Sequence, residues 1–442
     1  MKASRLKGPG LIFAAPASGS GKTTLVAGLL RLLARRGVPA SAAKLGPDYI
    51  DAAFHSAALG RACLNIDLWA MRPETVLAML DRLSQDGALA VVEGAMGLFD
   101  GAADGTASAA DFAVLTGWPV ILIIDARGQA QSAGALLGGF ARHRADTAID
   151  GVIFNRVGGA SHEAALRRAA GPLGIPVLGC IPRVEDLRLP ERHLGLVQAM
   201  EHGDLEGFLD RLADCLEPRL DLGKLLDLAR PIRPQPALSK MESLPPLGQR
   251  IAVSRDAAYG FVYAGQLDAW HQAGSEIIFF SPLADEAPPA ACDAVYLPGG
   301  YPELHAGRLA TGSAFLDGLR RVAATDTVIF GECGGYMTLG TGLVDKDGQR
   351  HAMAGLLPLE SSFAEPRLHL GYREASLRDT GPLGLAGATF RGHEFHYVTV
   401  LAEGEGEALF DCHDALGQSL GSTGRRRGNI SGSFIHLIDR RI

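Results

Sequence analysis

The sequence lacks clustered cysteines and long apolar runs. Its six cysteines, at positions 63, 180, 215, 292, 333 and 412, show no CxxC spacing, which argues against both a disulfide framework and a zinc site. A membrane-spanning helix needs about 18 or more apolar residues, and the best run here, Trp118–Ile124, is less than half as long. We therefore expect a soluble, cytoplasmic protein with no membrane partner.

Excess positive charge is also missing. The chain carries 42 Lys and Arg against 49 Asp and Glu, a formal net charge of −7, and Arg425–Arg427 is its one dense basic run. A nucleic-acid-binding surface needs a basic patch or stripe. We therefore expect no nucleic-acid partner and instead a small, anionic substrate.

Enough apolar residues are present for two or three domains, because 47% of the 442 residues are hydrophobic. From residue 11 to about 183, short apolar runs alternate with helix-length amphipathic stretches, which predicts a parallel sheet with helices on both faces. Residues 184 to about 230 are expected to be mostly helical. The expected strands are Leu11–Ala15, Ala40–Lys44, Leu89–Glu93, Val120–Asp125, Gly151–Asn155 and Pro176–Ile181, and the first helix is expected at Thr23–Arg36.

A second α/β series follows a proline-rich stretch that is typical of a linker. We place the boundary between 235 and 248, giving an N-terminal domain at 1–235 and a C-terminal domain at 248–442. The oligomeric state is left open, with a homodimer as one arrangement. The elements expected in the second series are strands at Ile251–Ser254, Glu276–Phe280, Ala294–Leu297 and Thr327–Phe330, helices near Tyr263–Ala273 and Ala314–Ala324, and added antiparallel strands in Gly371–Glu374, Arg391–Val400 and Gly417–His436.

A phosphate-binding loop is predicted directly after the first strand, at Pro16–Thr24. Small residues leave the backbone N–H groups free to surround phosphates at a helix N-terminus, with a lysine for the β/γ-phosphates and a hydroxyl for Mg²⁺. Pro16 stands where the usual pattern has its first glycine. The expected ATP-binding residues of this loop are Gly19, Ser20, Gly21, Lys22, Thr23 and Thr24.

Acidic residues follow two later strands, in the segments 44–51 and 91–100. The carboxyl ends of parallel strands meet at the edge that carries the phosphate-binding loop. Since Mg²⁺ prefers a few hard oxygens plus water, Thr23, Asp48 and Glu93 are the expected ligands. The alternative is that these acids only cap helices or stabilise turns. This alternative is weaker for Asp48 and Glu93, and for Asp51 and Asp100 it is as good as a role in the site.

Cys333 is the candidate nucleophile. It ends an apolar strand between glycines, as in a sharp strand-to-helix elbow, and we expect the helix N-terminus after it to lower the thiol pKa. The backbone amides of Gly299 and Gly300, after another strand, suit an oxyanion hole. His436 is the leading candidate base, with His393 and His396 as alternatives; their spacing is not that of a zinc-binding H-E-x-x-H motif.

Taken in order, several motifs resemble the cobyrinic acid a,c-diamide synthase family of cobalamin biosynthesis. The resemblance covers nearly the whole chain. It implies an α/β protein whose first half is a dethiobiotin synthetase-like P-loop domain with a parallel sheet and whose second half is a class I glutamine amidotransferase-like α/β domain. The motifs are A-P-A-S-G-S-G-K-T-T, K-L-G-P-D-Y-I-D, V-E-G-A-M-G-L-F-D-G, L-P-G-G-Y-P-E, G-E-C-G-G-Y-M, G-H-E-F-H-Y and S-G-S-F-I-H.

The resemblance also implies roles for single residues. Cys333 becomes the glutamine nucleophile and His436 its base. Common class I amidotransferases carry a glutamate two residues after that histidine, but this sequence has Ile438 there, so what orients His436 is not identified. The resemblance further places Asp48, Tyr49, Ile50, Glu93 and Asp100 at the ATP, Mg²⁺ and corrinoid end of the synthetase site, Asn155 at adenine, and the Gly334 amide in the oxyanion hole.

The implied reaction is amidation of the a and c carboxylates of a corrinoid, with ATP, Mg²⁺ and L-glutamine. ATP would convert each carboxylate into an acyl phosphate, and ammonia released from glutamine would attack it. The Ala/Gly/Arg-rich composition is typical of a GC-rich bacterium, and in such bacteria the aerobic, metal-free route is common. We therefore expect hydrogenobyrinic acid as the substrate in preference to cobyrinic acid. Two alternatives are a cobyric acid synthase that amidates other corrinoid carboxylates and a non-amidating P-loop ATPase regulator.

Overall fold

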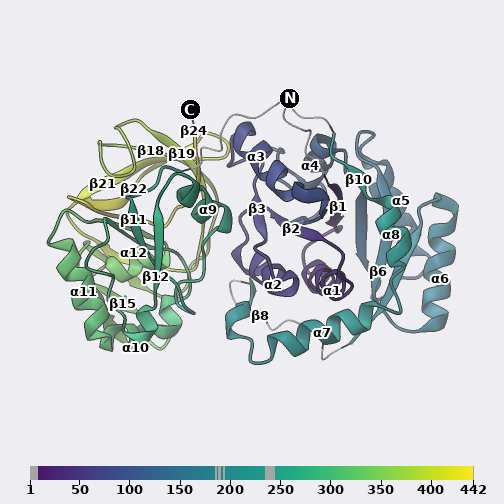
Figure 1. Cartoon of the computed structure of the whole chain (residues 1–442), viewed down its shortest axis with the longest axis horizontal. Coiled ribbons are helices and arrows are strands. Elements are labelled where there is room, and N and C mark those ends of the chain that lie inside the picture. Colours follow the sequence, from purple (N-terminus) through teal and green to yellow (C-terminus); the bar gives the residue numbers. More distant parts are fainter. Residues whose placement is uncertain (1–7, 185–186, 188–190, 193–194, 234–243, 442) are drawn as a thin grey trace. The chain divides into compact units, whose positions relative to one another are not determined.

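The computed structural model describes residues 8–184, 187, 191–192, 195–233 and 244–441. The chain divides into two compact units (Figure 1). Unit 1 comprises Met1–Trp69 and Val76–Ser239, and unit 2 comprises Ala70–Thr75 and Lys240–Ile442. Most of the predicted boundary region at 235–248, including Pro236, lies outside the described residues.

Unit 1 is built on a parallel sheet in which β1 (Pro9–Ala14) lies between β4 (Leu89–Glu93) and β5 (Val120–Asp125). The strand order is β3-β2-β4-β1-β5-β6-β7, with β10 added antiparallel to β1. The central position of β1 places the loop after it at the middle of the sheet's carboxyl edge. The other strands are β2 (Ala40–Leu45), β3 (Leu64–Ile66), β6 (Ile149–Val157), β7 (Val177–Pro182), β8 (Glu191–Arg192), β9 (Gly195–Leu196) and β10 (Arg230–Pro231).

Helices with recognisable start and stop residues surround this sheet. The α1 helix (Lys22–Arg35) buries an apolar stripe and packs against α2 (Tyr49–Leu59) and α7 (Leu205–Leu216) (Figure 1). Ser108 and Asp111 form a reciprocal capping box at α4 (Ala109–Thr116). The remaining helices are α3 (Pro73–Leu83), α5 (Ser132–His143), α6 (Ala160–Ala170) and α8 (Leu222–Leu228), with short 3₁₀ turns η1 (Gln85–Gly87), η2 (Gly171–Leu173) and η4 (Ala199–Glu201).

Unit 2 contains a ten-stranded mixed sheet in the order β12-β11-β13-β14-β23-β22-β21-β18-β19-β24. Its first five strands are parallel, so the carboxyl ends of β13, β14 and β23 lie side by side. The strands are β11 (Arg250–Ser254), β12 (Glu276–Phe280), β13 (Ala294–Leu297), β14 (Val328–Glu332), β18 (His369–Leu377), β19 (Thr389–His396), β21 (Glu407–Asp414), β22 (Ser419–Arg427), β23 (Ile430–Ser433) and β24 (His436–Arg441).

Helices and a small sheet complete unit 2. Two apolar clusters of buried side chains pack against the large sheet. The helices are α9 (Ala264–Gln272), α10 (Ala306–Thr311), α11 (Ser313–Ala323) and α12 (Gly334–Leu339), with turns η5 (Pro282–Ala284) and η6 (Pro302–His305), and the small sheet contains β15 (Gly342–Val344), β16 (Arg350–Ala352), β17 (Leu359–Ser362) and β20 (Thr399–Glu403).

A short segment from the first half of the chain, Ala70–Thr75, belongs to unit 2. The buried Asp439 carboxylate explains this. Its Oδ2 accepts hydrogen bonds from the Arg72 backbone N–H at 2.9 Å and from the Thr75 hydroxyl at 2.6 Å, and its Oδ1 pairs with the Arg72 guanidinium at 3.0 Å. Unit 2 is therefore not one continuous stretch of sequence.

Most expected strands are present within one or two residues of their predicted ends, and three differences stand out. The three-residue strand β3 was missed because its apolar run is short. The region 184–230 contains α7 and α8 but also the two-residue strands β8, β9 and β10, so it is less helical than expected. β23 pairs parallel with β14, whereas added antiparallel strands were expected there. Among the described residues, no helix has both the length and the apolar character needed to span a membrane.

Candidate functional site

The loop between β1 and α1 has the backbone shape of a phosphate-binding loop. Gly19 and Gly21 have φ values of 76° and 83°, in the left-handed region that favours glycine. A Cβ on Gly21 would lie 2.4 Å from the Asn155 side-chain nitrogen, so this position also needs glycine for space. Lys22 opens α1, where the helix N-terminus favours anions, and its Nζ donates to the Met96 carbonyl at 2.9 Å.

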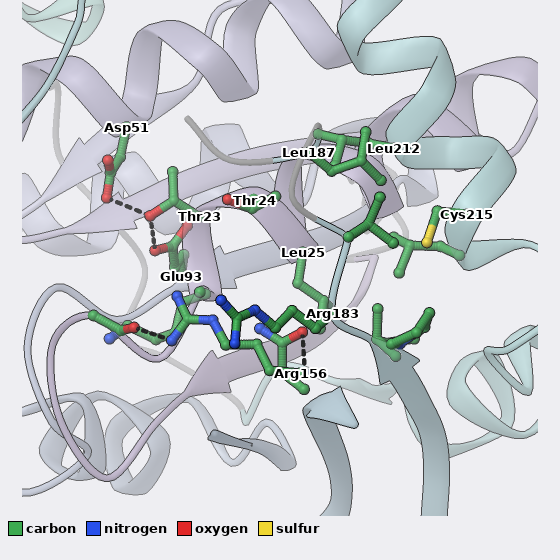
Figure 2. A pocket seen from close by; sticks show the side chains of 18 of the residues that line it. Thr23, Thr24, Leu25, Asp51, Glu93, Arg156, Arg183, Leu187, Leu212 and Cys215 are labelled. Carbon is green, nitrogen blue, oxygen red and sulfur yellow. Dashed lines mark hydrogen bonds between the residues drawn. The ribbon is translucent and has the colours of Figure 1, made fainter. Parts of the chain in front are cut away.

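Next to this loop, the Thr23 hydroxyl lies between two carboxylates. Its Oγ1 is 2.9 Å from Asp51 Oδ2 and 3.0 Å from Glu93 Oε1 (Figure 2). The buried Lys44 ammonium donates to the same two carboxylates, at 2.5 Å and 2.8 Å, and His55 Nε2 lies 2.5 Å from Glu93 Oε2. Three hard oxygens thus converge beside the phosphate-binding loop.

Charge pairing outweighs burial in this cluster. Burial by itself would lower the pKa of Lys44, but the Asp51 and Glu93 carboxylates raise it above its ordinary value. Burial would likewise raise the pKa of Glu93, but Lys44 and His55 hold it below its usual range. The Glu93 carboxylate therefore stays ionised, which is the state that binds a cation.

Asp48 has a different position from the one predicted. Its Oδ1 accepts hydrogen bonds from the Ile50 and Asp51 N–H groups, both at 3.0 Å, and so caps α2. Its other oxygen is 3.8 Å from Lys44 Nζ, and burial together with the Asp51 carboxylate raises the pKa of Asp48 to about 7. The oxygens that meet at Thr23 belong to Asp51 and Glu93. Thr23 and Glu93 of the predicted metal-binding set therefore lie together with Asp51, and the role of Asp48 as a metal ligand stays a prediction.

A cavity of about 820 Å³ extends from this cluster. Figure 2 shows Thr23 with its two carboxylates toward one end, and Leu187, Leu212 and Cys215 toward the other. One end therefore suits phosphates and the other an apolar ring. The lining residues include Ser18, Gly19, Gly21, Lys22, Thr23, Thr24, Asp48, Asp51, Glu93, Asn155, Arg156, Ile181, Pro182, Arg183, Val184, Leu187, Leu212, Cys215 and Leu216.

The residues after β6 support the phosphate-binding loop. Asn155 Nδ2 donates to the Ser20 carbonyl at 3.0 Å, and the Arg156 guanidinium donates to the Gly19 carbonyl at 2.8 Å and to Asp125 Oδ2 at 2.6 Å. Both residues line the cavity. The adenine contact expected of Asn155 stays a prediction, whereas its bond to the loop is present.

Three of the residues expected at the substrate lie outside the cavity lining. Tyr49 is the first residue of α2, and Ile50 is buried. Asp100 Oδ2 accepts a hydrogen bond from the Gly97 N–H at 3.0 Å and stabilises a turn. Of the four residues predicted to bind substrate, only Asp48 lines the described cavity, where it lies near the phosphate-binding loop.

In unit 2, Cys333 occupies a sharp elbow between β14 and α12. Its φ of 46° and ψ of −101° are unusual for a residue with a side chain, and its N–H donates to the Ser433 carbonyl at 2.8 Å. A Cβ on Gly335 would lie 1.9 Å from the Leu297 carbonyl oxygen, so the following turn fits only glycine. The backbone thus carries strain at the predicted nucleophile.

The pKa of Cys333 is raised overall, whereas we expected the helix N-terminus to lower it. Burial of the thiol raises its pKa, the Glu303 carboxylate adds to this, and the Gly334 N–H opposes it only in part. Helix α12 has just six residues. The resting thiol is therefore neutral and needs a base to become a nucleophile.

The expected oxyanion-hole glycines lie close together. A Cβ on Gly334 would approach Gly300 N to 3.2 Å, so the two amides are neighbours. A Cβ on Gly300 would lie 2.1 Å from the Ala258 carbonyl oxygen, and one on Gly299 would lie 2.4 Å from His436 Cε1. The structure therefore brings Gly299, Gly300 and Gly334 together with the predicted base.

His436 begins β24 and is buried. Its ring stacks on that of His393 with 4.8 Å between centroids and 12° between planes. Burial lowers the pKa of His436 to about 3 and that of His393 well below its ordinary value. A neutral imidazole can accept a proton from the thiol.

The third candidate histidine, His396, belongs to a group of possible metal ligands with His369 and Glu394, whose ligand atoms lie within 4.8 Å of one another. Arg373 Nε donates to the Glu394 carboxylate at 2.8 Å, and His396 Nε2 lies 2.9 Å from it. The Glu394 carboxylate therefore already has a cationic partner in Arg373 and a second partner in His396.

Comparison with known proteins covers both units. Residues 11–197 match the CobQ/CobB/MinD/ParA nucleotide binding domain, and residues 250–441 match the CobB/CobQ-like glutamine amidotransferase domain. Proteins named hydrogenobyrinate a,c-diamide synthase from Brucella anthropi and Sinorhizobium sp are each 52% identical over 97% of this chain and 98% of their own length. One from Rhizobium meliloti is 51% identical over 97% of this chain and 99% of its own.

The chain belongs to the hydrogenobyrinate a,c-diamide synthase family.

Family membership confirms the resemblance seen in the sequence and the α/β architecture of a nucleotide-binding half followed by a glutamine amidotransferase half. A solved glutamine amidotransferase with a TM-score of 0.30 and 19% identity, covering 42% of this chain and 89% of that one, is too weak a likeness to add to this. The roles of single residues in this synthase remain predictions.

Sequence reasoning missed several residues of these synthase sites. Lys44 and His55 were not considered because a buried lysine and a helical histidine give no local signal, and their roles depend on contacts with Glu93 across 49 and 38 residues. Asp51 lies in the same motif as Asp48, and the N-cap geometry decides between them. Arg156 directly follows Asn155, yet only the fold shows that it reaches Gly19.

Proposed function

We propose that this chain uses ATP and L-glutamine to convert the a and c carboxylates of hydrogenobyrinic acid into amides, in cobalamin biosynthesis. The observation that carries the proposal is the full-length identity of 50–52% to proteins named for this reaction. Both predicted constellations, the phosphate-binding loop and the cysteine elbow, occur in the one chain. A P-loop regulator would leave the elbow at Cys333 without a role.

In unit 1, ATP would transfer its γ-phosphoryl group to a substrate carboxylate. Lys22 would neutralise phosphate charge, and the Gly19–Gly21 backbone would surround the phosphates. Thr23, Asp51 and Glu93 supply the oxygen donors that Mg²⁺ prefers, and Mg²⁺ would neutralise charge on the β- and γ-phosphates. The apolar end of the cavity would hold the adenine ring.

In unit 2, glutamine would be hydrolysed. The Cys333 thiol gives its proton to His436 as its sulfur bonds to the side-chain carbonyl carbon of glutamine. The Gly300 and Gly334 amides would hold the oxyanion. The carbon–nitrogen bond then breaks, His436 returns the proton to the leaving ammonia, and water releases glutamate from the thioester. Ammonia would attack the acyl phosphate and displace phosphate.

The test is incubation of the full chain with Mg²⁺, ATP and glutamine plus either hydrogenobyrinic or cobyrinic acid, followed by product masses. The proposal expects the mass of a diamide with hydrogenobyrinic acid and a slower reaction with cobyrinic acid. Amidation at other positions only, or none with either corrinoid, would contradict it. We also place the reaction in the cytoplasm, which the six free cysteines support.

A further inference from the structure

A buried glutamate lies directly before the predicted nucleophile and was not among the predicted site residues. Glu332 ends β14, its side chain is about 2% exposed, and Cys333 follows it. A carboxylate removed from water is costly unless hydrogen bonds compensate. The partners of Glu332 therefore indicate why it is kept there.

Two hydrogen bonds fix the Glu332 carboxylate. Its Oε2 accepts from the Tyr296 hydroxyl at 2.7 Å, and its Oε1 accepts from the Leu437 N–H at 3.1 Å. Tyr296 lies on the adjacent strand β13. The second bond ties the end of β14 to the residue that follows His436, so one carboxylate connects the strand of the nucleophile with the strand of the base.

The same carboxylate faces the ring of His436. Glu332 Oε2 lies 3.8 Å from His436 Nδ1, with both side chains buried. This distance is longer than a direct hydrogen bond, and catalytic hydrogen bonds are often long before substrate binds. On its other sides, the ring stacks on His393 and contacts Gly299.

We propose that Glu332 is the positioning residue for His436, in place of the glutamate that common class I amidotransferases carry two residues after the histidine. A carboxylate at Nδ1 keeps the proton on that nitrogen, so that Nε2 is the unprotonated nitrogen and can accept the thiol proton of Cys333. It also stabilises the imidazolium that forms. Ile438, at the usual position, is an apolar side chain and can do neither.

This inference rests on the proposed roles of Cys333 and His436. Its test uses full-length Glu332→Gln, assayed for ammonia release from glutamine and for amidation with free ammonia. The amide keeps the size of the side chain and can still accept from Leu437 N–H, but it removes the charge and can turn a donor toward Nδ1. We expect glutaminase kcat to fall on the order of 10²-fold, with KM for glutamine within about twofold.

Two further variants distinguish the charge of the Glu332 carboxylate from the hydrogen bonds that hold it and from a general effect of a Glu→Gln change. Tyr296→Phe removes one bond to Glu332 and keeps the charge, so kcat should fall by less than about tenfold. Glu360→Gln makes the same substitution at a carboxylate that pairs with Arg350, and it should leave kcat unchanged. Ammonia-dependent amidation should be unchanged in all three variants.

A spectroscopic readout distinguishes positioning from packing. In ¹⁵N-histidine-labelled protein, with His436 assigned from the spectrum of His436→Gln, we expect the Nδ1–H tautomer in the unmodified chain and its loss in Glu332→Gln. Unchanged kcat, an unchanged tautomer, or equal loss of both activities with a lowered melting temperature would overturn the inference. Full glutaminase activity in Cys333→Ala or His436→Gln would instead contradict the proposed function.

Discussion

The two candidate sites handle buried ionisable groups in opposite ways. In unit 1, the buried Lys44 ammonium pairs with the Asp51 and Glu93 side chains, and the pKa of Lys44 is raised while that of Glu93 is lowered, so both of these groups are charged. In unit 2, burial raises the pKa of Cys333 and lowers that of His436 to about 3, so both are neutral at rest. The first arrangement suits a site that receives phosphates and a cation. The second suits a site that moves one proton.

The largest expected effect concerns the charged site. Glu93→Gln removes a carboxylate that Thr23, Lys44 and His55 all contact. Amidation should fall by about 10³-fold or more, because cation binding and the pairing of Lys44 are lost together. The measurement is ATP-dependent amidation at several Mg²⁺ concentrations, with ammonia supplied directly.

Glutaminase activity of the Glu93→Gln protein is the internal control, because its chemistry lies in unit 2. Thermal melting checks that the variant is folded. Near-normal amidation in a folded variant would make the carboxylate cluster structural and would remove the contrast between the two sites.

The next effect separates two neighbouring aspartates. Asp51 Oδ2 contacts Thr23, whereas Asp48 Oδ1 caps α2. Asp51→Asn should therefore lower amidation by about 10²-fold, with Mg²⁺ dependence shifted to higher concentration. Asp48→Asn should lower amidation by less than about tenfold, since asparagine is also a good N-cap. Equal losses of amidation in the two variants, or a larger loss in Asp48→Asn, would indicate that Asp48 is a cation ligand.

A smaller effect is expected at the neutral site from one added methyl group. Gly299→Ala places a Cβ 2.4 Å from His436 Cε1 and must displace that ring. Glutaminase kcat should fall about tenfold or more, with ammonia-dependent amidation unchanged. Gly307→Ala is the matched control, because its Cβ would meet only ordinary contact with His351 at 3.5 Å. Similar kcat values for the two variants would contradict the placement of His436.

The smallest effect is on stability as a function of pH. The folded pKa of His436 is lowered, so the unfolded chain binds its proton first as pH falls below about 6.5. Stability should therefore decrease from pH 6.5 toward lower pH. His393 acts in the same direction. Glu332 acts oppositely, since its pKa is raised to about 7 and its contribution falls as pH rises from 4.5 to 7.

Melting curves of the unmodified chain and of His436→Asn isolate the histidine. Between pH 7.5 and 5, the melting temperature should fall less for the variant than for the unmodified chain. The difference should be about 2–4 °C for each kcal/mol of unfolding free energy that the neutral His436 costs at low pH. Glu332, which titrates in the same pH range, and the neighbouring Arg373 and Glu394 are present in both proteins, so their contributions cancel in the comparison. Parallel curves would mean that His436 is not held neutral by burial.

Sequence patterns predicted the parts of these sites that depend on local backbone. The phosphate-binding loop and the elbow at Cys333 are encoded by glycines at fixed offsets from an apolar strand, so both are visible in the residues themselves. The parallel sheets were predicted for the same reason, because apolar runs alternate with helical patterns. The three-residue strand β3 has too short a pattern to be distinguished from a loop.

Sequence patterns did not predict which distant side chains meet. Glu332 and Leu437 are 105 residues apart, and the pairing of β24 with β19 brings His436 beside His393. The pKa of Cys333 was misjudged because burial is a property of the folded unit and outweighs the nearby backbone N–H. The cap that Asp48 forms was not predicted either, because it depends on where α2 begins; which of Asp48 and Asp51 would bind a cation stays a prediction.

The most direct test of the two-site account is amidation by the Cys333→Ala protein with two nitrogen donors. The account predicts that glutamine-dependent amidation is lost, by about 10³-fold or more, while amidation with free ammonia proceeds at the rate of the unmodified chain. Product masses measured under saturating ATP, Mg²⁺ and hydrogenobyrinic acid give both rates. Loss of both activities in a folded variant, or retention of both, would contradict the claim that one unit releases ammonia and the other uses it.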